Sequence, residues 1–224
     1  LRISLGGGMA VQDAVAIKWQ EVTGSPLLEA YGLSETSPAA TINPTDGSHR
    51  MGSIGLPIPN TEIRIFDEDK KEVASGERGE IGIKGPQVMA GYWNRPDGTK
   101  EVMHGDYFLT GDIGIMDEDG FFKIVDRKKE MVCVSGFNVY PSEVEAVISS
   151  HPKVLEVGVR SEPNPKTTEC VMAFIVKKDD SLTEDEIKDF CKDKLTNYKH
   201  PKIIVFRDEL PKSNVGKILR RKLI

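Results

Sequence analysis

The fold is decided by VDRKKEMVCVSGFNVYPSEVE, residues 125–145. Its charged run, 126–130, lies between two apolar segments, and a glycine turn then leads into a marked helix start. Charged runs are usually solvated turns, but one that links an apolar segment to a new turn and helix is typical of a joint between domains. The sequence therefore predicts two domains, residues 1–126 and 127–224, with a hinge near 126–130.

On the C-terminal side of this stretch, helices and strands alternate. Ser142 and Glu145 match a capping box, in which the serine side chain accepts an early backbone N–H and the glutamate reaches back. A second capping box at 183–186 predicts a helix with one apolar stripe. Strands are predicted at 154–159, 171–176 and 203–206. This alternation predicts a compact α+β module that folds by itself.

On the N-terminal side, the sequence predicts a strand, a helix and then a β-rich region. Residues 3–5 read as the end of a buried strand, and the apolar spacing of 11–23 predicts a helix. From about residue 60 to 125, short strands with frequent Gly and Pro predict a small β-barrel-like subdomain or a twisted antiparallel sheet. Its last hairpin turns at 117–120, where an Asp-Gly pair suits positive φ. The predicted fold class of the chain is α+β.

The composition excludes several classes of protein. A formal net charge of -5 provides no global positive field, so nucleic acid is not an expected partner. Cys133, Cys170 and Cys191 are odd in number and lack metal-ligand spacing, which argues against a disulfide framework or zinc site and favours a reducing cytoplasm. The four scattered histidines receive no role. No apolar run reaches the ~18 residues of a membrane span, and there is no secretory signal pattern.

Two loops combine residues that can bind a nucleotide. In YGLSE, residues 31–35, the aromatic ring can stack on a base, the hydroxyl can contact a phosphate and the carboxylate can hold Mg²⁺. In YFLTGD, residues 107–112, Asp112 is expected at a strand start after a glycine, where its two oxygens can bind ribose hydroxyls. Each stretch has a simpler interpretation, a serine-rich turn and an Asp in a β-turn, and local sequence leaves both open.

A third stretch, PKSNVGK at 211–217, is a Gly-Lys loop before a basic tail. It is not a P-loop, because Pro211 stands where the first glycine is required and Ile218 replaces the hydroxyl residue. Lys217 can still deliver a movable positive charge to a phosphate or carboxylate. Without the other motifs, a solvated basic terminus would be the preferred interpretation of this stretch.

The motifs gain meaning from their order. The chain carries YGLSE, GEIGIKGPQVMAGYWNRP, YFLTGD, the stretch at 125–145 and PKSNVGK in succession. In this order it resembles the adenylate-forming enzymes of the acyl-CoA synthetase branch, specifically the C-terminal part of bacterial-type long-chain fatty acid–CoA ligases. The resemblance runs from Gly6 to the end of the chain. It implies that residues 1–126 are the remnant of a large adenylation domain and that 127–224 are its mobile C-terminal domain.

The resemblance also implies a nucleotide site in the first domain. Tyr31 would lie against adenine, with Gly32 in the same loop, and Ser34 would contact the α-phosphate where many relatives have threonine. Glu35 would coordinate Mg²⁺, and Asp112 would grip the ribose hydroxyls. Arg127 would assist Asp112 at the ribose, and Gly7 and Gly8 would border the nucleotide and acyl channel.

In the second domain, the resemblance implies a catalytic residue that moves by rotation at a hinge. Lys217 would be the mobile catalytic lysine, and Lys129 would be the pivot. The strand Ser135-Gly136-Phe137 would line the tunnel for the pantetheine arm of CoA, with Gly136 leaving room for close approach.

The implied reaction is that of an acid–thiol ligase. A fatty acid attacks ATP to give an acyl-adenylate and pyrophosphate, and CoA thiol then displaces AMP. The implied substrates and cofactors are fatty acid, ATP, Mg²⁺ and CoA. The polypeptide itself is expected to be inactive, because it lacks the family's phosphate loop, and residues 1 to about 60 are expected to expose the apolar stripe of their helix. Peripheral contact with the inner membrane face, a homodimer, a medium-chain or aryl acid as substrate, and a non-catalytic partner-docking role stay open.

Overall fold

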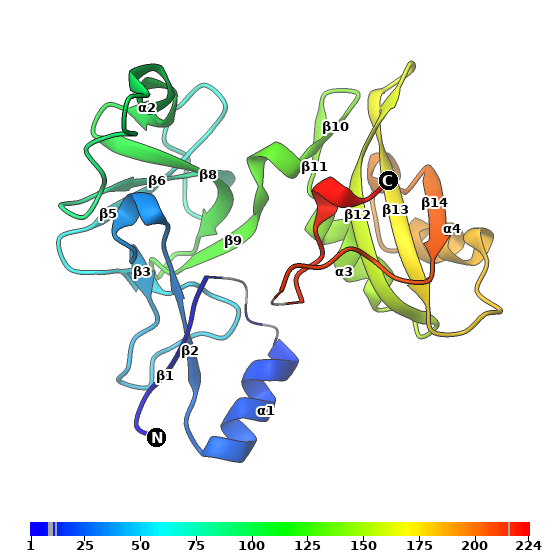
Figure 1. Ribbon diagram of the computed structural model, residues 1–224, viewed down its shortest axis with the longest axis horizontal. Coiled ribbons are helices and arrows are strands. Elements are labelled where there is room, and N and C mark those ends of the chain that lie inside the picture. The colour runs from blue at the N-terminus through cyan, green and yellow to red at the C-terminus, as the bar shows by residue number, and fades with distance from the viewer. Residues whose placement is uncertain (9–10, 12, 215) are drawn as a thin grey trace. The chain divides into compact units, whose positions relative to one another are not determined.

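The computed structural model describes residues 1–8, 11, 13–214 and 216–224 (Figure 1). It consists of two compact units, Leu1–Ile124 and Val125–Ile224. The division falls two residues before the boundary expected from the sequence. The mixture of helices with three sheets confirms the predicted α+β class.

The first unit begins with a sheet of four short strands. They pair in the order β1 (Ser4–Gly6), β2 (Leu27–Tyr31), β3 (Thr41–Ile42) and β4 (Leu56–Pro57). β1 and β2 are parallel and the remaining pairs are antiparallel. The parallel pair is connected through helix α1 (Asp13–Thr23), because parallel neighbours need a crossover.

The first strand and helix are only partly covered. The strand predicted at 3–5 is confirmed as β1, but its predicted burial is wrong, since Ile3 and Leu5 are each more than half exposed. The predicted helix is confirmed from Asp13, and Gln12 lies outside the described residues. The buried residue of α1 is Ala16. The predicted exposed stripe is also present, formed by Val15, Trp19 and Val22.

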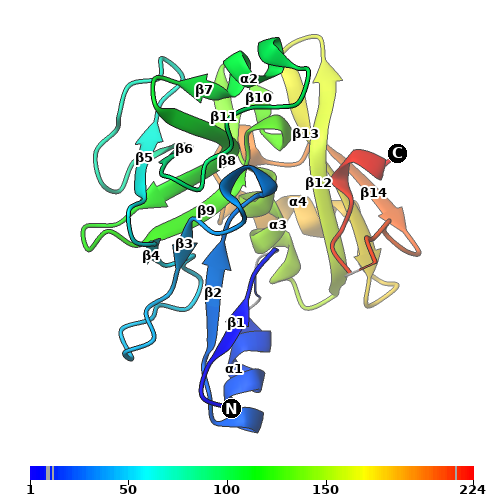
Figure 2. The ribbon, with the colours of Figure 1, turned by 60° about the vertical axis from the view of Figure 1, so that its left-hand side comes forward.

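The second sheet of this unit is the predicted antiparallel, β-rich region (Figure 2). Its strands are β5 (Glu62–Phe66), β6 (Arg78–Lys84), β8 (Tyr107–Met116) and β7 (Met103–His104), in that order, with β9 (Phe122–Arg127) paired to β8. Helix α2 (Pro96–Val102) precedes β7. Alternating isoleucines of β5 and β6 form the core with Phe122. The hairpin turn at 117–120 is confirmed, with φ 83° at Gly120.

The second unit is a five-stranded sheet with two helices. The strands pair in the order β11 (Phe137–Val139), β10 (Val132–Val134), β13 (Thr168–Lys177) and β12 (Val154–Asn164), and β14 (Ile203–Arg207) pairs with β13. The helices are α3 (Pro141–Ser149) and α4 (Glu184–Lys192). Their apolar faces pack on the sheet through residues that include Val144, Ile148 and Ile187. The predicted strands and helices are therefore present, and β12 and β13 are longer than predicted.

The two predicted capping boxes have different outcomes. The first is wrong: Tyr140 is the N-cap and Pro141 occupies the first helical position, so Ser142 already lies inside α3. The Ser142 hydroxyl donates instead to the Val125 carbonyl at 2.7 Å. At α4, the N-cap half of the box is confirmed, since the Thr183 side chain accepts from the Glu186 backbone N–H at 3.2 Å, while the Glu186 carboxylate pairs with Lys153 at 3.0 Å.

The hairpin between β10 and β11 differs from the predicted strand at 135–137. Ser135 and Gly136 have φ values of 52° and 84°, so they form a two-residue turn with both residues in the left-handed region. The strand β11 begins at Phe137. Gly136 is therefore at the exposed tip of a hairpin. Its backbone conformation explains the glycine, because a side chain is strained there.

Cys191 should be unreactive in the folded protein. It lies on the buried face of α4, and burial raises the pKa of its thiol from 9.0 to about 11. At pH 8 the thiolate fraction is then about 100-fold lower than in the unfolded chain, and alkylation by iodoacetamide should slow by at least that factor. Mass spectrometry after native and urea-denatured alkylation measures this difference.

The same shift predicts a pH dependence of stability. The Cys191 thiol of the folded state keeps its proton in the pH range where the same thiol of the unfolded state loses it. Its contribution to the free energy of unfolding is therefore complete below pH 9 and is lost as pH rises to about 11. The free energy of unfolding in urea, measured between pH 9 and about 11, should decline less in Cys191→Ala than in the wild type. Rapid alkylation of native Cys191, or an unchanged decline in the variant, would contradict the prediction.

Candidate functional site

Two of the predicted motifs meet in the first unit. The Tyr31 hydroxyl, at the end of β2, donates to Asp112 Oδ2 at 2.6 Å, although the residues are 81 positions apart. Asp112 is 2% exposed. The prediction that Asp112 begins a strand is wrong, because it lies within β8, directly after Gly111 with φ 72°. The two motifs thus form one site, in which the Tyr31 hydroxyl is hydrogen-bonded to a buried carboxylate.

The backbone before Asp112 is held by side chains of β6 and β8. The Gly111 N–H donates to the buried Glu80 carboxylate at 3.0 Å, and the Thr110 hydroxyl donates to the Ile81 carbonyl at 3.0 Å. The pairing of β6 with β8 shifts register between Glu80 and Gly82. Such a bulge redirects the side chains of a strand, and here it accompanies the placement of Asp112 beside Tyr31.

The YGLSE loop closes tightly on itself. The Ala40 N–H donates to the Tyr31 carbonyl at 2.8 Å, and the Leu33 N–H donates to the buried Thr36 hydroxyl at 2.9 Å. Residues Ser34–Thr36 form a 3-10 turn, η1. Ser34 is exposed on this turn, next to Glu35. The loop therefore presents a hydroxyl and a carboxylate from a fixed backbone.

Tyr92 orients the Glu35 carboxylate. The Tyr92 hydroxyl donates to Glu35 Oε1 at 2.8 Å, and the Met89 N–H donates to the Glu35 carbonyl at 2.8 Å. Burial and the neighbouring Glu35 raise the pKa of Tyr92, so the phenol stays protonated as a donor. Sequence reasoning gave Tyr92 no role. The signal was its place in GEIGIKGPQVMAGYWNRP, one of the motifs in the ordered series.

The donor set around Glu35 suits Mg²⁺ better than a transition metal. Within the described residues, no group of three or more His, Cys, Asp or Glu side chains is placed to hold a metal ion. Mg²⁺ is commonly bound through one or two carboxylates, with waters and substrate phosphates completing its octahedron. The single carboxylate Glu35 fits this mode.

Gly32 is required by the closure of the loop. A Cβ at Gly32 would lie 1.6 Å from the Pro38 carbonyl oxygen. Because that obstacle is backbone, no side-chain movement relieves it, and Gly32→Ala should destabilise the first unit by about 3 kcal/mol. Both tryptophans, Trp19 and Trp93, belong to this unit, so their fluorescence during urea unfolding measures the effect.

The matched control for Gly32→Ala is Gly98→Ala, on α2. The nearest heavy atoms to a Cβ at Gly98 are 3.8 Å away, which is ordinary van der Waals contact. Alanine also favours the helix, so this variant should change stability by less than about 1 kcal/mol. Equal unfolding midpoints for the two variants would contradict the role of Gly32.

Gly7 and Gly8 directly follow β1, at the end of β2 that leads to Tyr31. β1 pairs with β2 up to Gly6 opposite Glu29, so the next residues run alongside Ala30. A Cβ at Gly7 would lie 3.2 Å from the Ala30 carbonyl oxygen, and Gly8 has φ 79°. Met9 and Ala10 are outside the described residues.

The remaining predicted site residues belong to the second unit. Arg127 ends β9 and is exposed, and Lys129 is exposed within the 3-10 turn η2 (Lys128–Glu130). Lys217 is exposed on a short hairpin loop, in which the Ser213 N–H donates to the Lys217 carbonyl at 2.8 Å. Lys217 and Gly136 are thus on loops of the same unit.

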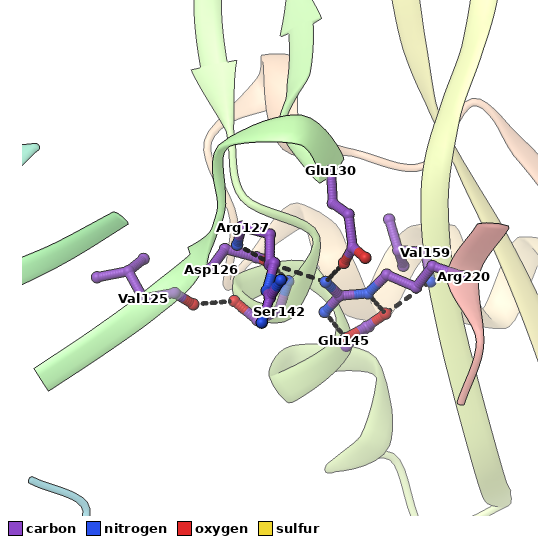
Figure 3. A network of polar contacts seen from close by, with 8 residues as sticks. All are labelled: Val125, Asp126, Arg127, Glu130, Ser142, Glu145, Val159 and Arg220. Carbon is purple, nitrogen blue, oxygen red and sulfur yellow. Dashed lines mark hydrogen bonds and ion pairs between the residues drawn. The ribbon is translucent and has the colours of Figure 1, made fainter. Parts of the chain in front are cut away.

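Arg220 forms an ion cluster that sequence reasoning missed, because its acidic partners are distant in the sequence (Figure 3). The residue lies on the 3-10 turn η4 (Arg220–Lys222). Its guanidinium contacts Asp126 Oδ1 at 2.7 Å, Glu130 Oε2 at 2.5 Å and Glu145 at 2.8 and 2.5 Å. Burial by itself lowers the pKa of Arg220, but hydrogen bonding to Glu145 and the nearby carboxylate charges raise it overall. Arg220 therefore stays charged.

Comparison with known families gives two matches, both to domain models of AMP-binding enzymes. The AMP-binding enzyme family model matches residues 1–93, and the model of the AMP-binding enzyme C-terminal domain matches residues 143–217. The first range contains Tyr31, Ser34, Glu35 and Tyr92, and the second ends at Lys217. Among the described residues, no helix is long and apolar enough to cross a membrane.

Curated relatives match over essentially the whole chain. A long-chain-fatty-acid–CoA ligase of Yersinia pestis is 58% identical over 223 residues, which are 100% of this chain and 40% of that protein. The Bacillus subtilis long-chain-fatty-acid–CoA ligase is 45% identical with the same coverage. A 2-succinylbenzoate–CoA ligase of Geobacillus kaustophilus is 42% identical over 98% of this chain and 44% of its own length.

Solved structures match the fold. ATP-bound MatB from Rhodopseudomonas palustris gives a TM-score of 0.90 at 35% identity, covering 98% of this chain and 44% of that one. The o-succinylbenzoate CoA synthetase MenE from Bacillus subtilis, in complex with the acyl-adenylate OSB-AMP, gives 0.84 at 33% identity, covering 99% and 46%.

Proposed function

The chain belongs to the AMP-binding enzyme family, and from this we propose that it is the C-terminal part of an ATP-dependent long-chain fatty acid–CoA ligase. The observation that carries the proposal is 58% identity to a long-chain-fatty-acid–CoA ligase along the full chain. The chain spans about 40% of the length of the curated relatives it matches. The activity therefore belongs to the longer protein, and the 224-residue chain alone should release no acyl-CoA.

The nucleotide part of the proposal rests on the first unit. Tyr31 would lie against adenine, Asp112 would bind the ribose hydroxyls and Ser34 would contact the α-phosphate. The support is geometric, since Tyr31 and Asp112 are joined at 2.6 Å and Ser34 is exposed on the adjoining turn. Gly7, Gly8 and Gly32 allow the backbone to run close to the bound nucleotide and acid.

Glu35 would hold Mg²⁺, which neutralises phosphate charge when bound. The protein's own contribution is to orient the carboxylate, through the Tyr92 hydroxyl, and to fix the loop backbone, through Thr36. A carboxylate held by a donor at one oxygen keeps its second oxygen for a cation. A transition-metal site is not part of the proposal.

Lys217 would supply the mobile charge for adenylate formation. Negative charge gathers around the α-phosphorus when the fatty carboxylate attacks, and positioning with electrostatic neutralisation provides most of the catalysis in such transfers. An ammonium on an exposed loop can approach for this step. Arg127 would assist at the ribose, and rotation at Lys129 would bring Lys217 to the nucleotide and remove it again.

The CoA step would use another face of the second unit. The hairpin tip with Gly136 would line the pantetheine tunnel, because glycine leaves room for a ligand close to the backbone. The proposal includes a cytoplasmic location, with peripheral contact at the inner membrane face where an apolar acid partitions. It also includes self-association through the exposed apolar side chains of α1.

The substrate class is tested by acyl-CoA formation. The longer protein is supplied with ATP, Mg²⁺, CoA and one acid from a series of medium-chain, long-chain and aryl acids. Long-chain acids should have kcat/KM at least about tenfold above the others, since each methylene in an apolar pocket contributes to discrimination. A preference for an aryl acid would favour the second candidate, which the 42% identity to a 2-succinylbenzoate–CoA ligase supports. Absence of acyl-CoA with every acid would refute both.

A further inference from the structure

The ion cluster of Arg220 spans the proposed pivot. Asp126 precedes Lys129 in the chain and Glu130 follows it, and one nitrogen of Arg220, Nη1, contacts both carboxylates, at 2.7 and 2.5 Å. Arg220 lies three residues after Lys217. The base of the catalytic loop is thus tied to both ends of the hinge stretch (Figure 3).

Two members of the cluster, Asp126 and Arg220, are buried enough for their ion pair to affect stability. The Asp126 side chain is 3% exposed and that of Arg220 is 16% exposed. Exposed ion pairs contribute little, whereas a charge left unpaired at a buried position is costly. Asp126 Oδ2 also accepts the Ser142 N–H at 2.8 Å, and Oδ1 accepts the Arg127 N–H at 2.8 Å. Both oxygens of this carboxylate are therefore engaged.

The far side of the cluster fixes Arg220 to the body of the second unit. Glu145, on α3, binds two nitrogens of the guanidinium at 2.8 and 2.5 Å, in the bidentate geometry that orients arginine best. Glu145 Oε1 also accepts the Val159 N–H of the edge strand β12 at 2.8 Å. Arg220 is therefore a fixed point on the unit, from which it reaches the hinge.

We infer that Arg220 is a positioning residue that latches the hinge. A torsional change at Lys129 moves Asp126 relative to Glu130 and Arg220, so the Arg220–Asp126 pair must open when the second unit rotates. The latch holds one arrangement of the hinge until rotation breaks it. This inference rests on the proposed function for its catalytic consequence, but the latch itself is a property of the second unit.

The latch is tested first by hydrogen exchange on the full 224-residue chain. The Arg127 and Val159 amides donate to carboxylate oxygens that Arg220 also holds. In Arg220→Gln both amides should exchange roughly tenfold faster, because their acceptors lose their anchor. Arg220→Lys keeps the charge without the bidentate fork and should give an intermediate rate. Unchanged exchange at Arg127 would overturn the latch.

The matched control is Arg221→Gln. It removes the same charge from the next residue, which is exposed. Exchange at Arg127 and Val159 should stay at the wild-type rate in this variant. Equal acceleration in both variants would show a general charge effect of the tail, and would overturn the assignment to Arg220.

The second readout is the balance of the two half-reactions in the longer enzyme. Adenylate formation and thioester formation from supplied acyl-adenylate are measured separately for Arg220→Gln and Arg221→Gln. Release of the latch should change the ratio of the two rates about tenfold in Arg220→Gln and leave it unchanged in Arg221→Gln. Equal loss in both half-reactions would mean a merely structural role and would overturn the inference. If no half-reaction is detected in the wild type, the proposed function fails while hydrogen exchange still decides the latch.

Discussion

Replacing Lys217 by alanine in the longer enzyme is expected to lower the rate of adenylate formation by about 10²–10³-fold, the usual loss when one preorganised charge or donor is removed from a transition state. Thioester formation from supplied acyl-adenylate should stay within about threefold of wild type, because that step needs no positive charge at the phosphorus. Pyrophosphate release measures the first step, and acyl-CoA formed from purified acyl-adenylate measures the second.

The control for Lys217→Ala is Lys222→Ala, which removes an exposed charge from the same tail. It should change both rates by less than about twofold, because the contribution of an isolated surface charge is small. If Lys217→Ala slowed both half-reactions equally, Lys217 would act on folding or on a shared step, and a lysine that serves one step and leaves for the next would be excluded.

Lys129→Pro is expected to impair thioester formation far more than pyrophosphate release, by about 10²-fold in the ratio of the two rates. Proline fixes its own φ near −65° and restricts the residue before it, so η2 can no longer change its torsions freely. A conformational step that requires rotation at this position would then limit the second half-reaction.

Lys129→Ala separates the torsional effect from the charge. Alanine removes the ammonium, which is exposed in η2, but leaves the backbone free to rotate. Both half-reactions should stay within about threefold of wild type. A loss in Lys129→Ala as large as that in Lys129→Pro would assign the effect to the charge, and parallel losses in both half-reactions would argue against Lys129 as the pivot.

Local signals in the sequence predicted many elements correctly. The Asp-Gly turn at 117–120 and the N-cap at Thr183 are formed by residues within a few positions of each other. Short-range interactions therefore determine both features, and the sequence alone predicts them. The apolar stripe predicted for the helix after 183–186 likewise identified the face of α4 that is buried.

Local signals failed where a distant group competed for the same atom. Ser142 and Glu145 have the spacing of a capping box, but the hydroxyl donates to Val125 and the carboxylate binds Arg220, 75 positions away. A charged partner offers a stronger hydrogen bond than a neighbouring amide, so the tertiary contact prevails over the local motif. Asp112 was misplaced for a related reason, since the length of β8 depends on its partner β6 rather than on its own sequence.

The sequence by itself determined the α+β class, the succession of elements and the ordered motifs that point to an adenylate-forming enzyme. These features depend on the spacing of residues along the chain, which can be read directly from the sequence. Only the tertiary structure decided which polar groups meet: Tyr31 with Asp112, Tyr92 with Glu35, and Arg220 with Asp126 and Glu130. The physical reason is that a polar group pairs with the partner that the packed chain brings within reach, and must do so where it is buried, as at Asp112 and Asp126. That partner is set by the fold and not by sequence distance.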